Sequence, residues 1–263
     1  GIIARSGGTT RWVEWDQEKY PYLARVVWKE SAAPLCIVVQ NRTQQEELLL
    51  AVDPSTGATP ELLREKDSAW LNLDPKPKPA WTKDGQQFLW TTERNGTWQV
   101  ELHSADGALL RAVTPVDFNL DEFIDLNETD QSITVAGGPD PREQHLLRFK
   151  LGSESEPQRL TRDAGRHNAL FSDAKESFLH RFDLLNGQTG WEILRSSDGT
   201  KIATLPSVAE RPSSLPTVEL VRTNSSPAMD AAIVRPRDFK NGKTYPVILD
   251  VYGGRHHKQL LAQ

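Results

Sequence analysis

The chain has 263 residues, a formal net charge of −5, and 37% hydrophobic and 25% charged residues. This composition is typical of a globular protein with a sizeable core and excludes an extended disordered chain. The 31 basic residues are scattered, and no apolar run approaches the roughly 18 residues of a membrane span. Neither a nucleic-acid partner nor a membrane span in this chain is therefore expected.

Turn signals recur along the first three quarters of the chain. One series combines Asp, Ser and Gly between runs that hold apolar residues, at residues 53–57, 104–107, 151–154 and 196–199. A second series, out of phase with the first, stands at residues 81–85, 126–130 and 171–175. Each series repeats at roughly 45 to 50 residues, and Asp-Gly between apolar runs is a strong hairpin signal.

The two series together predict one four-stranded antiparallel unit per repeat. Such a unit cannot bury both faces alone, and stacking into a β-propeller is the usual solution. Residues 20–205 hold about four units, with 22–28 opening the first and 12–15 closing the unit before it. The proline-rich residues 74–79 are expected to form a loop at the rim, because proline cannot donate to a strand ladder. A set of unrelated hairpins is the alternative. The presence of two turn series with the same repeat length disfavours it.

A different pattern begins after residue 205. Prolines and serines at 205–216 have the composition of a linker. Three strand-like runs follow at residues 218–222, 230–234 and 247–252. The third is apolar almost throughout, as expected for a strand buried on both faces of an α/β sheet.

Few residues point to chemistry. The lone Cys36, in an apolar run, is expected to be a buried core thiol. No G-x-S-x-G nucleophile motif and no metal- or phosphate-binding motif occurs. His256 and His257 are adjacent, but we expect a solvated loop pair rather than a metal site. In residues 249–254, Leu-Asp-Val-Tyr-Gly-Gly, the Tyr252 phenol could donate to an oxyanion or simply pack at a strand end, and the spacing alone favours neither.

Residues 245–254 closely resemble the entry to the hydrolase domain of the dipeptidyl peptidase IV family, in the prolyl oligopeptidase clan. Residues 231–239, which lead to this motif, resemble the same family. The earlier part is similar to the propeller of its bacterial members, on residues 70–73, 88–96, 141–146, 159–161 and 171–173. The resemblance covers residues 12–258, nearly the whole chain.

This resemblance implies a mainly β chain: a partial propeller followed by the first strands of an α/β-hydrolase domain. Residues 1–210 would be the C-terminal part, about four blades, of an eight-bladed propeller, and 211–263 the truncated start of the peptidase domain. The family releases N-terminal dipeptides with proline or alanine second, from peptides held in a cavity between the domains. No cofactor or metal is implied, and a periplasmic or secreted location is favoured.

Tyr252 falls on the family's oxyanion tyrosine and is the one catalytic residue that the resemblance carries over. The serine, aspartate and histidine of the triad would lie beyond Gln263, and the glutamates that hold the substrate amine before Gly1. This chain alone is therefore expected to be inactive. Arg255 stands where the family usually has proline, which relaxes the turn that aims the tyrosine.

Two alternatives remain open from the sequence. The chain could be a non-catalytic propeller module that binds peptide or protein through its rim loops, or part of an oligopeptidase or acylaminoacyl peptidase of the same clan. About four blades make half a ring, so open strand edges are expected to drive self-association.

Overall fold

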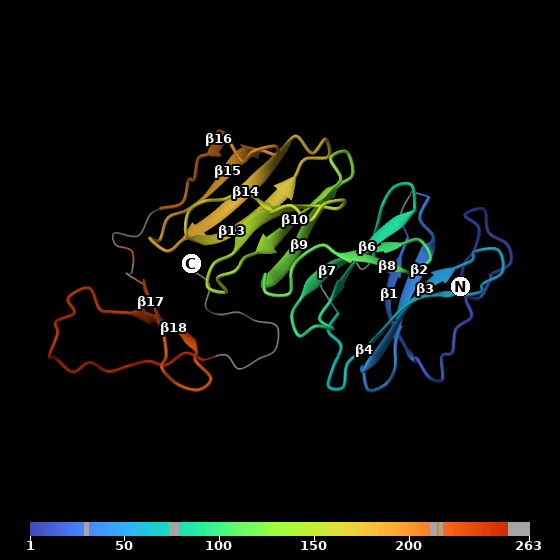
Figure 1. The fold of residues 1–263 in the computed structure, drawn as a ribbon, viewed down its shortest axis with the longest axis horizontal. Helices are drawn as coiled ribbons and strands as arrows, with labels where there is room; N and C mark the ends of the chain where they lie inside the picture. Colours follow the sequence, from blue (N-terminus) through green and yellow to red (C-terminus); the bar gives the residue numbers. More distant parts are fainter. Residues whose placement is uncertain (29–31, 74–78, 211–214, 216–217, 252–263) are drawn as a thin grey trace. The chain divides into compact units, whose positions relative to one another are not determined.

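The computed structural model describes residues 1–28, 32–73, 79–210, 215 and 218–251. These residues form strands and turns, and no helix occurs among them. Consequently, no helix in the described part is long and apolar enough to cross a membrane. The strands of each sheet follow one another in the chain, as Figure 1 shows by colour and label.

Four four-stranded antiparallel sheets form most of the chain. The first contains β1 (Tyr22–Val27), β2 (Leu35–Gln40), β3 (Glu46–Val52) and β4 (Glu61–Lys66). The second contains β5 (Ala80–Trp81), β6 (Gln87–Thr92), β7 (Gln99–Ser104) and β8 (Leu109–Ala112). The third contains β9 (Leu120–Asn127), β10 (Ser132–Gly137), β11 (His145–Lys150) and β12 (Gln158–Arg159). The fourth contains β13 (Gly165–Phe171), β14 (Ser177–Leu184), β15 (Thr189–Arg195) and β16 (Lys201–Leu205).

This arrangement confirms the predicted partial β-propeller. The first series of turn signals lies between the third and fourth strands of each sheet, and the second series between the first and second strands of the later three. Gly107 illustrates why glycine is needed at such a turn. Its φ is +91°, and a Cβ there would collide with the backbone of Leu62 in β4.

The contact between the first and second sheets is an apolar core. Cys36, Val38, Leu49 and Leu63 of the first sheet pack there against Trp81, Phe88 and Trp90 of the second. Every residue of β2 is buried, as expected for a strand packed on both faces. The prediction for Cys36 is confirmed, since its side chain is fully buried and burial raises the pKa of the thiol to about 11.

Two strand predictions are wrong. Residues 12–15 form no strand, because their backbone bonds to a turn: Glu14 N donates to Gly57 O at 2.9 Å. Residues 247–251 are also not a strand, since no strand pairs with them among the described residues. The rim loop predicted at 74–79 lies, apart from Pro79, outside the described residues.

The chain divides into two compact units. One comprises Gly1–Ile133 with Phe149–Ser155, and the other comprises Thr134–Arg148 with the residues from Glu156 onward. The second unit also holds a separate two-stranded sheet of β17 (Val218–Arg222) and β18 (Asp230–Val234). Both of these strands were predicted, as was the turn at 224–227 that joins them.

Candidate functional site

The site residue predicted from the sequence, Tyr252, lies outside the described residues, as do Arg255, His256 and His257. The segment that leads to Tyr252 is described as far as Val251. Its apolar side chains are exposed, from 72% for Val251 to 97% for Ile248. The described part of this segment therefore builds no enclosed pocket of its own.

The most unusual polar group in the described residues is a stack of three histidines in the second unit. His145 begins β11, His167 lies in β13 and His180 in β14. Their exposed fractions are only 4%, 2% and 5%. The ring of His167 lies between the other two, with both centroid distances at 5.1 Å. We call these three residues the histidine stack.

Hydrogen bonds determine the tautomers within the stack. His167 Nε2 lies 2.8 Å from the carbonyl oxygen of Asp163, which can only accept, so Nε2 carries the proton. His167 Nδ1 must then accept from His180 Nε2, 2.9 Å away. His180 Nδ1 is left as a buried lone pair without a hydrogen-bond partner, 3.8 Å from a carboxylate oxygen of Glu192.

Burial disfavours the charged form of all three rings. It lowers the pKa of His145 and His167, and it lowers the pKa of His180 to about 4, with a further contribution from the neighbouring His167. The stack is therefore neutral at physiological pH.

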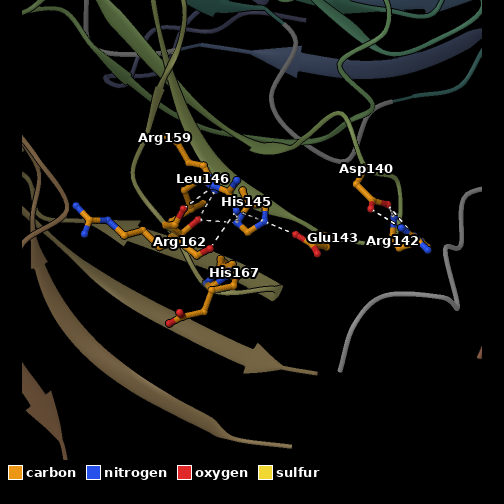
Figure 2. Close-up of polar contacts among 10 residues, drawn as sticks. Asp140, Arg142, Glu143, His145, Leu146, Arg159, Arg162 and His167 are labelled. Carbon is orange, nitrogen blue, oxygen red and sulfur yellow. Dashed lines mark hydrogen bonds and ion pairs between the residues drawn. The ribbon is translucent and has the colours of Figure 1, made fainter. Parts of the chain in front are cut away.

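His145 also takes part in an arrangement that looks like a catalytic triad. Its Nε2 lies 2.7 Å from Glu143 Oε2 (Figure 2). Its Nδ1 lies 3.2 Å from the hydroxyl of Thr161. A hydroxyl, an imidazole and a carboxylate in this order are the components of acyl-transfer catalysis. Arg159 crowds the same ring, with its Nη2 2.6 Å from His145 Nε2.

The hydroxyl is nevertheless committed to structure. Thr161 is 3% exposed, and its Oγ1 accepts a hydrogen bond from the backbone N–H of Leu146 at 3.1 Å. The second sheet repeats this bond without any histidine: Thr114 Oγ1 accepts from Val100 N at 2.9 Å. We therefore interpret both threonines as strand clamps, in which a hydroxyl after the outer strand pins the third strand of the sheet.

The loop before β11 carries a charged pair near the two-stranded sheet. Arg142 donates to both carboxylate oxygens of Asp140, at 3.0 and 2.8 Å (Figure 2). This bond, helped by Arg222 of β17, lowers the pKa of Asp140 to about 2. The pair is about one-third exposed, so its contribution to stability is small. Within the described residues, no group of three or more His, Cys, Asp or Glu side chains could hold a metal ion.

Comparison with known proteins identifies the relatives of this fold. Residues 1–186 match the family described as the dipeptidyl peptidase IV (DPP IV) N-terminal region. The chain belongs to the dipeptidyl peptidase IV family. This finding confirms the resemblance inferred from the sequence motifs.

Solved structures with the DPP IV name share the fold. Porphyromonas gingivalis dipeptidyl peptidase 4 superposes with a TM-score of 0.81 at 20% identity, over 92% of this chain and 35% of that chain. A Bacteroides ovatus protein provisionally described as a dipeptidyl aminopeptidase IV gives a TM-score of 0.78 at 16% identity, over 92% of this chain and 38% of that one. The chain thus spans little more than a third of the length of these DPP IV structures.

Sequence reasoning missed the histidine stack in this DPP IV propeller segment. The three histidines are separated by 22 and 13 positions, which matches no metal-ligand motif. The strand clamps did leave a signal, because Val113-Thr114 and Leu160-Thr161 follow the outer strands of consecutive sheets.

Proposed function

We propose that this chain is part of a serine exopeptidase that releases N-terminal dipeptides with proline or alanine in second position. The observation that supports this function is the match of residues 1–186 to the DPP IV N-terminal region. In this proposal residues 1–210 belong to the propeller and form one wall of the substrate cavity. Residues 211–263 begin the α/β-hydrolase domain. Peptide is the partner, and no cofactor is needed.

Tyr252 is the proposed oxyanion donor. A phenol hydroxyl directed at the tetrahedral intermediate stabilises charge that develops only in the transition state. Acyl transfer also needs a nucleophile and a base. Because the 263 residues contain no G-x-S-x-G motif and Thr161 serves as a strand clamp, we propose that these residues alone have no peptidase activity.

The test begins with the natural gene product. Extract from the source is treated with a fluorophosphonate probe, and the product is captured with an antibody against this chain. We expect a labelled band much heavier than 29.5 kDa that cleaves Gly-Pro- and Ala-Pro-p-nitroanilide. An unlabelled band near 29.5 kDa without such activity would refute the proposal.

A second experiment tests the role of Tyr252 in that labelled product. Tyr252→Phe should lower kcat by roughly 10²- to 10³-fold with little change in KM, as for loss of an oxyanion-hole donor. Tyr245→Phe is the matched control, since the Tyr245 hydroxyl accepts a hydrogen bond from Lys240 N in a local turn. Equal activities of the two variants would remove Tyr252 from the oxyanion hole.

A non-catalytic binding module is the second candidate, favoured by the open face of the fourth sheet. That face has a hollow of about 370 Å³, beside which Leu170 is 70% and Trp191 43% exposed. Arg181 lies over the Trp191 ring at 5.6 Å. In this reading the open face and strand edges drive self-association, so sedimentation of the purified chain should show concentration-dependent oligomers, whereas a monodisperse monomer would contradict it.

Activity on blocked peptides separates the related enzymes. An acylaminoacyl peptidase or oligopeptidase would accept a substrate without a free amino terminus. The proposed dipeptidyl peptidase should cleave Ala-Pro-p-nitroanilide and leave the N-acetylated compound intact.

A further inference from the structure

The histidine stack has the geometry of an acid-sensitive contact. All three rings are nearly inaccessible to water, and two of them are joined by a hydrogen bond whose direction is determined by the Asp163 carbonyl. At neutral pH each ring nitrogen of His167 has one partner and one role. A proton added to His167 or His180 must therefore either break this chain of bonds or enter at His180 Nδ1.

The charged groups around the stack can compensate only partly. Glu143 and Asp140 on the β11 side favour a charge on His145, whereas Arg159 of β12 opposes it. Asp163 and Arg159 act in opposite senses on His167. Glu192 of β15 is the carboxylate near His180, but its other oxygen lies 3.1 Å from the ammonium of Lys201 on β16. Glu192 is thus shared between His180 and Lys201.

The stack lies where β11 joins the fourth sheet. Gln144, which precedes β11, donates its backbone N–H to Gly165 O at 3.0 Å, and His167 N donates to Gln144 O at 2.9 Å. The side-chain amide of Gln144 donates to His167 O at 3.0 Å. Charge in the rings would separate the two segments that these bonds connect.

We propose that the histidine stack is a pH switch: protonation on acidification loosens the contact between the start of β11 and β13–β14 and frees the loop that carries Asp140 and Arg142. The three rings hold the contact closed while they are neutral. The switch does not depend on the proposed peptidase activity.

The size of the effect follows from His180. An imidazole in the opened state has a pKa near its ordinary value of roughly 6.5, whereas burial lowers the pKa of His180 to about 4 in the closed state. Opened states bind the extra proton between these values. Between pH 7.5 and pH 5 the opening equilibrium should therefore rise about 30-fold from this one group.

Hydrogen exchange of the full chain tests the switch. Exchange is measured at pH 7.5 and pH 5 and corrected for the intrinsic pH dependence of amide exchange. We expect amides of β13 and β14 to lose protection about 30-fold while those of β2 and β3, which contain no histidine, keep theirs. Equal changes in both regions, or no change in β13 and β14, would overturn the proposal.

A pair of variants locates the effect. His180→Gln can still donate an N–H to His167 but cannot be protonated, so its β13–β14 amides should show a smaller acid response than wild type. His103→Gln is the matched control, because His103 is 2% exposed and lies in β7 of the other unit. It should keep the full response in β13–β14. If the β13–β14 amides of His180→Gln respond to acid as in wild type, the stack is not the switch. Should either variant fail to fold, the comparison of wild-type exchange at pH 7.5 and pH 5 decides the question.

Discussion

Two contacts between neighbouring sheets pack in different ways within the same repeat. Between the first and second sheets the contact is formed by apolar side chains, with Phe88 and Trp90 of β6 fully buried. Between β11 and the fourth sheet the contact holds the histidine stack, and Arg148 of β11 donates to Ser196 O at 2.5 Å. The repeat therefore determines the backbone and leaves the chemistry of the contact free to differ. The stability of the first contact should therefore depend on how well its side chains fill the core. The stability of the second should depend on pH.

The largest expected effect concerns the apolar contact. Phe88 packs on Trp81 with ring centroids 4.8 Å apart and on His103 at 5.1 Å. Phe88→Ala should lower the free energy of unfolding by about 3–5 kcal/mol, because a cavity adds to the lost burial. Urea denaturation at pH 7.5 measures the change. Leu110→Ala, at a side chain 49% exposed, is the control and should cost less than about 0.5 kcal/mol.

Acid should weaken the second contact next most strongly. The pKa of His180 is about 4 in the folded chain and roughly 6.5 when unfolded, so the unfolded state binds more protons between these values. Stability is thus retained above pH 6.5 and falls as the pH drops toward 4, by about 3 kcal/mol for this group. Urea midpoints at pH 7.5 and 4.5 should show the loss in wild type, with a smaller loss in His180→Gln. A flat profile would mean that the stack is hydrated in solution.

The contact between the first and second sheets also contains a buried ion cluster. Arg94 Nη2 lies 3.3 Å from both Glu65 Oε1 and Glu101 Oε2, whose side chains are only 4% and 3% exposed. Arg94→Met removes a cation that these two buried carboxylates share. Because Arg94 itself is 36% exposed, the cost should be about 2 kcal/mol rather than the roughly 3–5 of a fully buried pair. Lys150→Met, at an exposed pair with Asp130, should be nearly neutral.

The smallest expected effect concerns the strand clamp, which occurs in both regions. Thr114→Val and Thr161→Val each remove a hydroxyl that accepts a buried backbone N–H, and each should cost about 1 kcal/mol. Similar values would support one strand clamp repeated in two sheets. If Thr161→Val instead abolished peptidase activity of the natural product while leaving its stability unchanged, Thr161 would be a nucleophile and the clamp interpretation would be wrong.

Much of the fold was predictable because its signals are local. Turn residues such as Gly107 and Gly199 mark hairpins through backbone φ, which depends on a few neighbouring residues. The predicted strand at residues 12–15 failed because apolar residues alone do not form a strand. A strand needs a partner, and here Glu14 bonds to a turn at Gly57.

Of the candidate site residues, one was predicted from the sequence and the others were not. Tyr252 was singled out by a contiguous motif, and its role remains a prediction because the residue lies outside the described residues. The histidine stack was missed because its three members come from separate strands. Only the stacking of sheets brings His145 and His180 to opposite faces of His167.

The sequence by itself determined the repeat, the hairpins, the burial of Cys36 and the family, since each depends on residues close together in the chain. Only the tertiary structure shows that Thr161, His145 and Glu143 lie together. It also shows that the Thr161 hydroxyl accepts from Leu146 N as Thr114 accepts from Val100 N, which favours the strand-clamp interpretation. It also places the three stacked histidines in buried surroundings that lower the pKa of each ring. Charge on a side chain depends on the solvent and partners around it, and for His180 these are supplied by residues distant in the chain.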